Sequence, residues 1–463
     1  MTNKASSFPN ASSMPPLHRY GGVLASTPEL AMHVLGDAYW VEGTGTVRGL
    51  PAWPKGPPIH LYLVGNPTFV NSSKLLMPGG QNYTFSPGDS CWLLPLGDGV
   101  WRVLTVCRAD GIPFIPGGAS LFPKPQTRLT LTQGTPETLA DVAGSGATVL
   151  YLEPFDGDQV AVFDGVSAWL ILPVAPSTYG LPATQTQSGT LNGTTAVTGL
   201  TDTSQIPSSG VQVTGTNIQA NTIFTPTGAT TGTLSLAATG SGTSSLTFKL
   251  PPNTGYDVLL SSVGGLPKLT WSAAWSNDTT PPPRVLQNGV EVASGATTKR
   301  VIGSAHTTSL AGVLEDSHSL RYLSNRYNEV PRQMYAVDPA ATWNYSSATM
   351  RQANGNAANQ ISYFACVPRK IYAFAQGMVT CSTTINAKVD IGIDTTSGGS
   401  AQLVQFANVP ASNYVATNAI YTGTPGIGRH FVAWLEFGFG SGTQTWLGTS
   451  AGQVSGIIGE VAN

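Results

Sequence analysis

Residues 88–104, which read GDSCWLLPLGDGVWRVL, decide the fold class of this chain. Two short apolar runs flank the dipeptide Asp98-Gly99. Asp-Gly between two such runs predicts a two-residue hairpin turn, because glycine accepts the positive φ that the turn requires. Trp101 then lies on the returning strand, where core packing is the simplest role for it. The stretch therefore predicts a β-hairpin.

Two further stretches of the chain predict hairpins in the same way. Gly157-Asp158 is followed by an apolar run, an Asp164-Gly165 turn and Trp169. The spacing from glycine to tryptophan is 13 residues in the first copy and 12 in the second, which suggests a repeated unit. Asn288-Gly289 also lies between two apolar alternating runs. We expect an all-β fold made of several small antiparallel sandwich-like or barrel-like modules in an elongated chain.

The composition excludes several classes of protein. Only 10% of the 463 residues are charged, against about 25% in an average protein. Disorder requires low hydrophobicity and high net charge, whereas 41% of these residues are hydrophobic and the formal net charge is -2. The sequence has no cluster of basic residues, so it does not predict a nucleic-acid partner. An ordered chain kept in solution by neutral polar side chains is the expectation.

Neither export nor membrane insertion is predicted. Residues 1–16 are polar and lack the apolar core of a signal peptide, and the longest apolar runs are too short to span a bilayer. We expect synthesis in the cytoplasm and exit only within an assembled particle. The four cysteines form no C-x-x-C pair, so free buried thiols are favoured over a disulfide framework or a metal site.

Changes in composition and strand density divide the chain into five parts. These are an N-terminal segment at 1–40, β-modules at 41–118 and 119–183, a Thr- and Gly-rich part at 184–250, and a C-terminal β-domain at 251–463. Residues 184–250 carry only two charges and would suit a flexible linker. Their apolar residues alternate, however, so a small β-sandwich is favoured over disorder.

Residues that resemble catalytic or metal-binding groups have simpler interpretations. Ser90 follows Gly88-Asp89 as a nucleophile would, but Gln159 takes its place in the second copy, so no catalytic role is predicted. The acidic stretch from Glu153 to Asp164 favours solvated turns, with a calcium site and a glycosidase carboxylate pair as alternatives. The six histidines have no metal-binding spacing. We predict no catalytic residue, no metal and no cofactor.

Residues 299–332 are rich in charge for so uncharged a chain. Both signs are present, so ion pairs within or between chains are favoured over a site for an anionic glycan.

Ten short motifs lie along the chain: LLMPGG (75–80), GDS (88–90), GVWR (99–102), RLTLT (128–132), GTP (134–136), EDS (315–317), VPR (330–332), RQANG (351–355), GIGRH (426–430) and SGI (455–457). They resemble motifs in modules of tail fibre and tail receptor-binding proteins of tailed bacteriophages. The resemblance covers most of 41–182 and 251–463. The resemblance implies a homotrimer in the virion, docked on tail, baseplate or capsid proteins through residues 1–40, which match no motif.

The same resemblance implies that the distal end binds a host surface glycan or protein. Exposed aromatic rings suit a glycan, because an aromatic face packs on sugar C–H groups. The candidates lie near Gly-, Asn- or Thr-rich loops and are Trp343, Tyr345, Tyr414, Tyr421 and Trp446. A structural virion protein that attaches the phage to its host, and that is not an enzyme, is the expectation. The alternatives are a tailspike depolymerase of surface polysaccharide and a capsid-decorating or connecting fibre.

Overall fold

The computed structural model describes residues 19–32, 36–77, 82–109, 125–134, 146–166, 169–450 and 453–462. These ranges are built of β-strands, with one helical element among them, the 3-10 turn η3 (Ala353–Gly355), so the all-β expectation is confirmed. Within the same ranges no helix has the length and apolar character needed to cross a bilayer. The chain forms two compact units, Met1–Leu121 and Phe122–Asn463.

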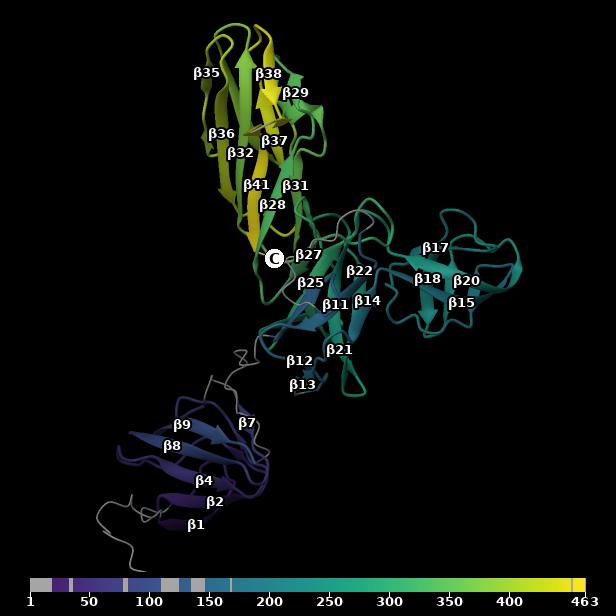
Figure 1. Ribbon diagram of the computed structural model, residues 1–463. Helices are drawn as coiled ribbons and strands as arrows, with labels where there is room; N and C mark the ends of the chain where they lie inside the picture. The colour runs from purple at the N-terminus through teal and green to yellow at the C-terminus, as the bar shows by residue number, and fades with distance from the viewer. Residues whose placement is uncertain are drawn as a thin grey trace, which may run out of the picture. The chain divides into compact units, whose positions relative to one another are not determined.

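The first unit contains a six-stranded sheet and a three-stranded sheet (Figure 1). The larger sheet has the order β1 (Tyr20–Ala25), β2 (Ala38–Glu42), β4 (Ile59–Leu63), β8 (Ser90–Gly97), β9 (Val100–Cys107) and β6 (Leu75–Leu76). The smaller sheet contains β3 (Thr46–Val47), β5 (Thr68–Phe69) and β7 (Tyr83–Thr84).

Pairing in the first unit is mixed, not purely antiparallel as expected. β1, β2 and β4 run parallel to one another, β8 and β9 follow as antiparallel neighbours, and β6 pairs parallel with β9 at the edge. Parallel neighbours need connections of about a dozen residues, and segments 26–37 and 43–58 supply them. The module therefore includes strands from residue 20 onward, and a boundary at residue 40 would cut β2. Residues 1–18 and the module end near residue 118 lie outside the described ranges.

The hairpin that decides the fold class forms as predicted. Gly97 pairs with Val100, and both turn residues have positive φ, 52° at Asp98 and 71° at Gly99. Trp101 is fully buried, and its Nε1 donates a hydrogen bond to the carbonyl of Pro51 at 2.9 Å. The hairpin thus places its tryptophan in the core of the first unit.

Replacing Gly99 with alanine is expected to lower the free energy of unfolding of the first unit by about 1–2 kcal/mol. A Cβ at Gly99 would meet no atom within 4 Å, so the whole cost comes from φ. Gly56→Ala is the control, because Gly56 has no positive φ and its Cβ would lie 3.7 Å from the nearest atom. Urea unfolding followed by tryptophan fluorescence measures both variants, and equal midpoints would contradict the prediction.

The second unit begins with two small sheets. They comprise β10 (Thr127–Thr130), β11 (Val149–Pro154) and β14 (Tyr179–Pro182) in one sheet, and β12 (Gln159–Phe163) and β13 (Trp169–Pro173) in the other. The hairpin expected around Asp164-Gly165 is present, but its loop has five residues, because Phe163 pairs with Trp169. Trp169 is only partly buried, unlike Trp101. The two proposed copies therefore differ in turn length and in the burial of their tryptophans.

The Thr- and Gly-rich part folds into a closed barrel and not the expected sandwich (Figure 1). Its strands, in order around the barrel, are β15 (Thr184–Asn192), β16 (Ala196–Thr198), β19 (Thr231–Leu234), β18 (Ile223–Gly228), β17 (Val211–Gly215) and β20 (Ser241–Lys249). β15 pairs along its whole length with β20, which closes the sheet on itself. The alternating apolar residues fill the barrel interior, as at Phe224 and Phe248.

A six-stranded antiparallel sheet follows the barrel. It contains β21 (Gly255–Val263), β22 (Leu266–Ala274), β23 (Arg284–Gln287), β24 (Val290–Ala293), β25 (Ala296–His306) and β27 (Leu323–Asn325). The predicted hairpin at Asn288-Gly289 is confirmed, since Gln287 pairs with Val290 and both turn residues have positive φ, 50° and 82°.

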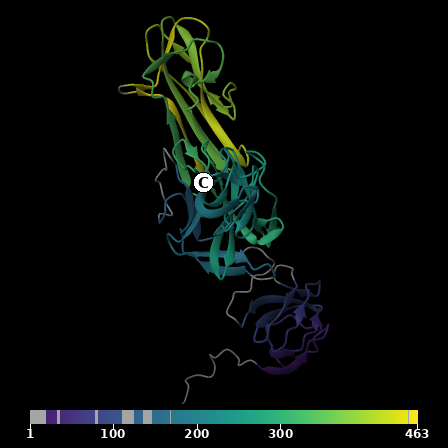
Figure 2. The same ribbon diagram turned by 90° about the vertical axis from the view of Figure 1, so that its right-hand side faces the viewer.

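Two sheets make up the C-terminal sandwich, whose long strands pair antiparallel and run side by side in both views, while the two-residue strand β26 pairs parallel with β31 (Figures 1 and 2). One contains β26 (Leu320–Arg321), β30 (Arg351–Gln352), β31 (Gln360–Ala365), β33 (Ile385–Ile393), β35 (Ala407–Val409) and β37 (Gly428–Phe437). The other contains β28 (Pro331–Val337), β29 (Thr342–Asn344), β32 (Ile371–Cys381), β34 (Leu403–Val404), β36 (Val415–Gly423), β38 (Gln444–Leu447) and β41 (Gly456–Ala462). A hairpin of β39 (Thr449–Ser450) and β40 (Gln453–Val454) lies between β38 and β41 in sequence.

The hydrophobic cores do not follow the five parts read from composition. One core runs from Leu129 to Leu323 and includes the small sheets, the barrel and the six-stranded sheet. A second core, from Met334 to Val461, lies in the sandwich. Strands β10–β14 therefore share a core with strands β21, β22, β25 and β27, and 251–463 contains two structural parts.

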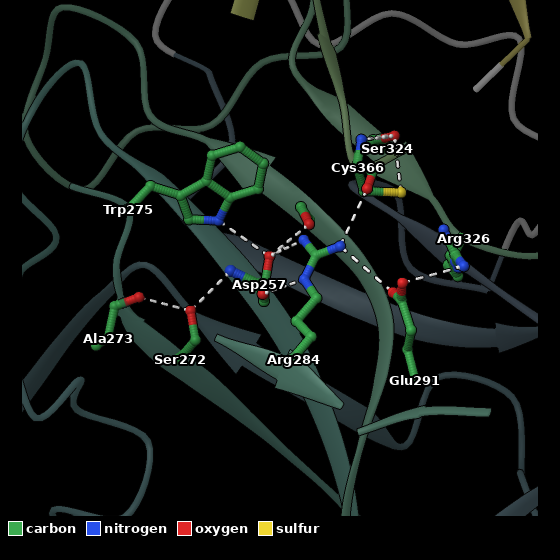
Figure 3. A network of polar contacts seen from close by, with 10 residues as sticks. Asp257, Ser272, Ala273, Trp275, Arg284, Glu291, Ser324, Arg326 and Cys366 are labelled. Carbon is green, nitrogen blue, oxygen red and sulfur yellow. Dashed lines mark hydrogen bonds and ion pairs between the residues drawn. The ribbon is translucent and has the colours of Figure 1, made fainter. Parts of the chain in front are cut away.

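A buried polar network lies where the six-stranded sheet meets the sandwich (Figure 3). Asp257 accepts hydrogen bonds from Arg284 at 2.7 and 2.9 Å and from the indole of Trp275 at 2.9 Å. Arg284 also donates to the carbonyl of Cys366 at 3.1 Å, next to β31 of the sandwich. One carboxylate thereby connects the two parts through a single arginine.

The GIGRH motif contributes to the same junction. The backbone N–H of Arg429 donates to the carbonyl of Asp278, and its side chain donates to the hydroxyl of Tyr322 at 2.7 Å. Gly428 has φ 111°, and a Cβ there would lie 2.1 Å from the Asp278 carbonyl oxygen. Only glycine fits this contact, which gives the motif a structural role.

The charge-rich stretch forms ion pairs within the chain, as predicted. Asp316 is buried between Arg332 at 2.7 Å and Arg321 at 3.4 Å. Arg326 pairs with Glu291 at 3.3 Å. All four cysteines are free, and three are buried while Cys107 is exposed.

Candidate functional site

Two of the five aromatic candidates are core residues and not surface contacts. Trp343 on β29 pairs with Trp446 on β38, and the two indoles are 9% and 0% exposed. The indole of Trp446 donates to the carbonyl of Tyr345 at 2.9 Å. Successive strand residues point to opposite faces, and these two positions face the sandwich core. Neither ring can pack on a receptor, so the prediction is wrong for both.

Tyr345 is the candidate whose ring is partly exposed and held in place by neighbouring groups. It follows β29, and its hydroxyl donates to the carbonyl of Thr349 at 2.6 Å. The guanidinium of Arg351 lies over its ring, 3.6 Å from the centroid. The ring also packs against the sandwich core, as Tyr421 does, so the stacked guanidinium, whose side chain is 35% exposed, forms the outer layer of the Tyr345–Arg351 surface.

Tyr414 and Tyr421 lie apart from this surface. Tyr414 is 58% exposed in the turn before β36. Tyr421 lies on β36 opposite Ala373 and packs against the sandwich core. In the described ranges no hydrogen bond or ring contact joins either tyrosine to Tyr345, so the five candidates do not form one site.

A buried carboxylate lies beneath the Tyr345–Arg351 surface. Glu436 on β37 is fully buried and accepts hydrogen bonds from Arg351 Nε at 2.8 Å, from Trp343 Nε1 at 2.6 Å and from the backbone N–H of Asn354 at 3.0 Å. Arg351 Nη2 also lies 2.8 Å from Glu436 Oε1. These bonds hold the guanidinium in one orientation over the tyrosine ring.

A second carboxylate, Asp338, organises the loop that follows β30. Its oxygens accept from three asparagine side chains, those of Asn354, Asn356 and Asn359, at 3.1, 3.2 and 2.6 Å. Asn354 has φ 55° and bonds to both carboxylates, through its backbone N–H to Glu436 and its side chain to Asp338. The RQANG motif is therefore the segment that joins the two buried acids.

The pKa values of the two carboxyl groups are shifted in opposite directions from their ordinary values. Burial raises the pKa of Glu436 above its ordinary value, although hydrogen bonds from Trp343 and Arg351 act against the shift. For Asp338 burial also acts to raise the pKa, but the backbone N–H of Ala340 and the three asparagine amides outweigh it and hold the pKa low. Every carboxylate oxygen accepts at least one N–H, so both acids act as a frame for the surface above them.

The sequence motifs proposed as catalytic or metal-binding alternatives have turn roles. Asp89 is buried and accepts the backbone N–H groups of Ser86 and Ala109, both at 2.9 Å. Glu153 is buried and accepts those of Gly134 and Ser177, also at 2.9 Å. No group of three His, Cys, Asp or Glu residues in the described ranges is placed to hold a metal ion.

Sequence reasoning missed Arg351, Asn354, Asp338 and Glu436 as parts of a site. The available signals were the RQANG motif, already singled out by its resemblance, and its Asn-Gly pair. A glutamate inside the apolar run of β37 was a further signal, since buried charges require partners.

No family model matches this chain, and no curated protein matches it. Among solved structures, a glycoside hydrolase family 43 arabinoxylan arabinofuranohydrolase from Bacillus subtilis is similar at 14% identity and a TM-score of 0.15, over 80% of this chain and 77% of that one. A Bacillus thuringiensis Cry1Da tryptic core variant is similar at 10% identity and a TM-score of 0.12, over 58% of this chain and 52% of that one. At such TM-scores neither likeness bears on the fold or the function of this chain.

Proposed function

We propose that this chain is a structural protein of a tailed phage virion that attaches the particle to a saccharide on the host surface, and that the Tyr345–Arg351 surface makes the contact. The observation that carries the proposal is the stacked pair itself, partly exposed and held by a buried carboxylate. The RQANG motif, which carries part of the resemblance to phage tail proteins, builds this surface.

The chemistry of the pair suits a sugar. The tyrosine ring supports the guanidinium plane from one side, the outer side of that plane can pack on sugar C–H groups, and its N–H groups can donate to hydroxyl or carboxylate oxygens. Glu436 holds Nε and Nη2 of Arg351, and Nη1 makes no hydrogen bond within the described residues. A surface fixed before binding loses little conformational entropy when the ligand arrives.

The resemblance also supports a homotrimer, and three copies of a weak site would act together, since linked sites raise the effective concentration. Light scattering on the purified chain should give three times the monomer mass. A monomer at micromolar concentration would contradict the trimer while leaving the saccharide site untouched.

Tyr345→Ala is expected to weaken inhibition of phage adsorption by the purified protein by about fivefold to about a hundredfold, because loss of one aromatic contact costs about 1 kcal/mol, or about fivefold, at one site and up to about 3 kcal/mol when three sites act together. Tyr372→Ala is the matched control, a strand tyrosine that is 45% exposed and lies outside this surface. The measurement is the protein concentration that halves adsorption to host cells. Equal potency of wild type and Tyr345→Ala would refute the assignment.

A depolymerase of surface polysaccharide is the alternative function, and one observation favours it. Glu436 and Asp338 are carboxylates with pKa values shifted in opposite directions, as an acid and a base pair would be. Their full burial and their N–H partners favour a binding surface instead. Purified protein should release no new reducing ends from host polysaccharide, and release abolished by Glu436→Gln would establish the enzyme.

Gold labelling of intact particles in the electron microscope distinguishes the remaining alternatives. Label on the tail is expected. Label on the head alone would favour a capsid-decorating or connecting protein.

A further inference from the structure

The outward face of the large sheet in the first unit carries a run of aromatic rings. They lie on four neighbouring strands, Tyr20 on β1, Trp40 on β2, His60 and Tyr62 on β4, and Trp92 on β8. We call these five residues the aromatic face. None of them belongs to the site described above, and the unit that carries them is a separate compact unit.

Strand pairing places the rings of the aromatic face in two adjacent rows. Trp40 pairs with Tyr62 in one row, and His60 pairs with Trp92 in the next. The rings of His60 and Trp92 are stacked, 4.3 Å apart with 4° between their planes. His60 lies 4.1 Å from Tyr62, and Tyr20 lies 5.9 Å from Trp40. The rings therefore form one continuous surface across four strands.

Burial shows that the aromatic face is additional to the core and not part of it. The alternate residues of the same strands, such as Tyr39, Leu61 and Cys91, are fully buried on the inner side. Tyr20, Trp40 and Tyr62 are 60%, 47% and 42% exposed, Trp92 is half-buried, and His60, between Trp92 and Tyr62, is 9% exposed. An antiparallel or mixed sheet with one solvated face ordinarily carries polar residues there, so a cluster of exposed rings marks a contact surface.

The charged and polar side chains beside the rings indicate which class of molecule the aromatic face binds. Glu42 lies on the same face, two residues after Trp40, and is exposed. Arg102 on β9 is also exposed on this face, because it pairs with Leu94, two residues after Trp92 on β8. One charge of each sign is not the basic groove that stacking sites for nucleic acids combine with aromatic rings. A protein partner that sealed the face would bury the carboxylate at a desolvation cost. The hydroxyls of Ser90, opposite Tyr62, and Thr105, opposite Trp92, add neutral hydrogen-bonding groups at the edge.

We propose that the aromatic face binds a neutral saccharide chain, with sugar rings packed on Trp40 and Tyr62 and with Glu42 accepting hydrogen bonds from sugar hydroxyls. Rings repeat from strand to strand at about 4.8 Å, so a chain lying across the strands contacts several of them. The proposal does not depend on the Tyr345–Arg351 surface, and it gives the chain a saccharide site in each of its two units.

The test uses the full chain in native gels that contain dextran, mixed-linkage β-glucan or galactomannan, with tryptophan fluorescence titration of any polysaccharide that retards it. Trp40→Ala and Tyr62→Ala are compared with Tyr372→Ala, which alters an equally exposed tyrosine in the other unit. All variants are also made in a Tyr345→Ala background, so that binding at the two sites is separated. Circular dichroism melts verify folding.

Retardation by at least one polysaccharide is expected, and it should weaken about tenfold in Trp40→Ala and in Tyr62→Ala in both backgrounds. Tyr372→Ala should bind as wild type does. Absence of retardation in all three gels, or equal retardation of Trp40→Ala and its parent, overturns the proposal. Tight binding of oligo(dT) or self-association that Trp40→Ala abolishes would also overturn it, in favour of a nucleic acid or a second copy.

Discussion

Replacing Asp257 with alanine is expected to lower the free energy of unfolding of the second unit by about 3–5 kcal/mol, because it breaks a buried ion pair. The variant leaves the guanidinium of Arg284, whose side chain is 10% exposed, without its carboxylate. The Trp275 indole and the Ser304 hydroxyl lose their acceptor at the same time. Urea unfolding of the full chain measures the loss.

The control for Asp257 is an ion pair of the same unit at the surface. Asp202 pairs with Lys268 at 3.0 Å, but the two side chains are 47% and 29% exposed. Exposed pairs contribute about 0–1 kcal/mol, so Asp202→Ala should change stability little. If the two variants lose equal stability, the network in Figure 3 does not hold the junction in the way we describe.

Asp338→Asn is expected to destabilise the sandwich by about 2–4 kcal/mol at pH 7, since charged hydrogen bonds contribute about 1.5–3 kcal/mol each and a neutral amide cannot accept from all four donors. The asparagine amides and the backbone N–H of Ala340 would then compete for one carbonyl oxygen. Urea unfolding at pH 7 checks the magnitude, with the exposed turn residue Asp156→Asn as control.

Asp338→Asn is also expected to make the stability of the chain less sensitive to acid. The pKa of Asp338 is lower in the folded chain than in the unfolded chain. Its contribution to stability is therefore complete above the ordinary aspartate pKa of about 3.9, and it is lost as the pH falls through the folded value. Between pH 5 and pH 3 the wild type should lose more stability than Asp338→Asn. Parallel stability curves would show that the carboxylate is not held as described.

The part of the fold that was predictable from sequence was local. Asp98-Gly99 and Asn288-Gly289 are turns because residues with positive φ are needed within four consecutive residues, and the chain itself specifies them. The turn at Asp164-Gly165 was only half predictable, because its strands pair at Phe163 and Trp169 and the loop is longer. Low charge and alternating apolar residues were enough to exclude helices and disorder.

The site could be predicted only in part, for the same reason. The RQANG motif marked the right segment, and aromatic residues near polar loops included Tyr345. Nothing local distinguishes Tyr345 from Trp343, two residues earlier, yet one is partly exposed and the other is buried. β29 ends at Asn344, so Trp343 still follows the alternation of the strand into the core, whereas Tyr345 lies beyond the strand end.

By itself the sequence determined the all-β class, the tight hairpins and the absence of a basic or apolar tract, because each depends on neighbouring residues or on composition. Tertiary structure alone decided the parallel pairing of β1, β2 and β4, the core that strands β10–β14 share with strands β21, β22, β25 and β27, and the placing of Glu436 under Arg351. These contacts join residues far apart in the chain, and their energy comes from burial and hydrogen bonds that exist only once the strands have packed.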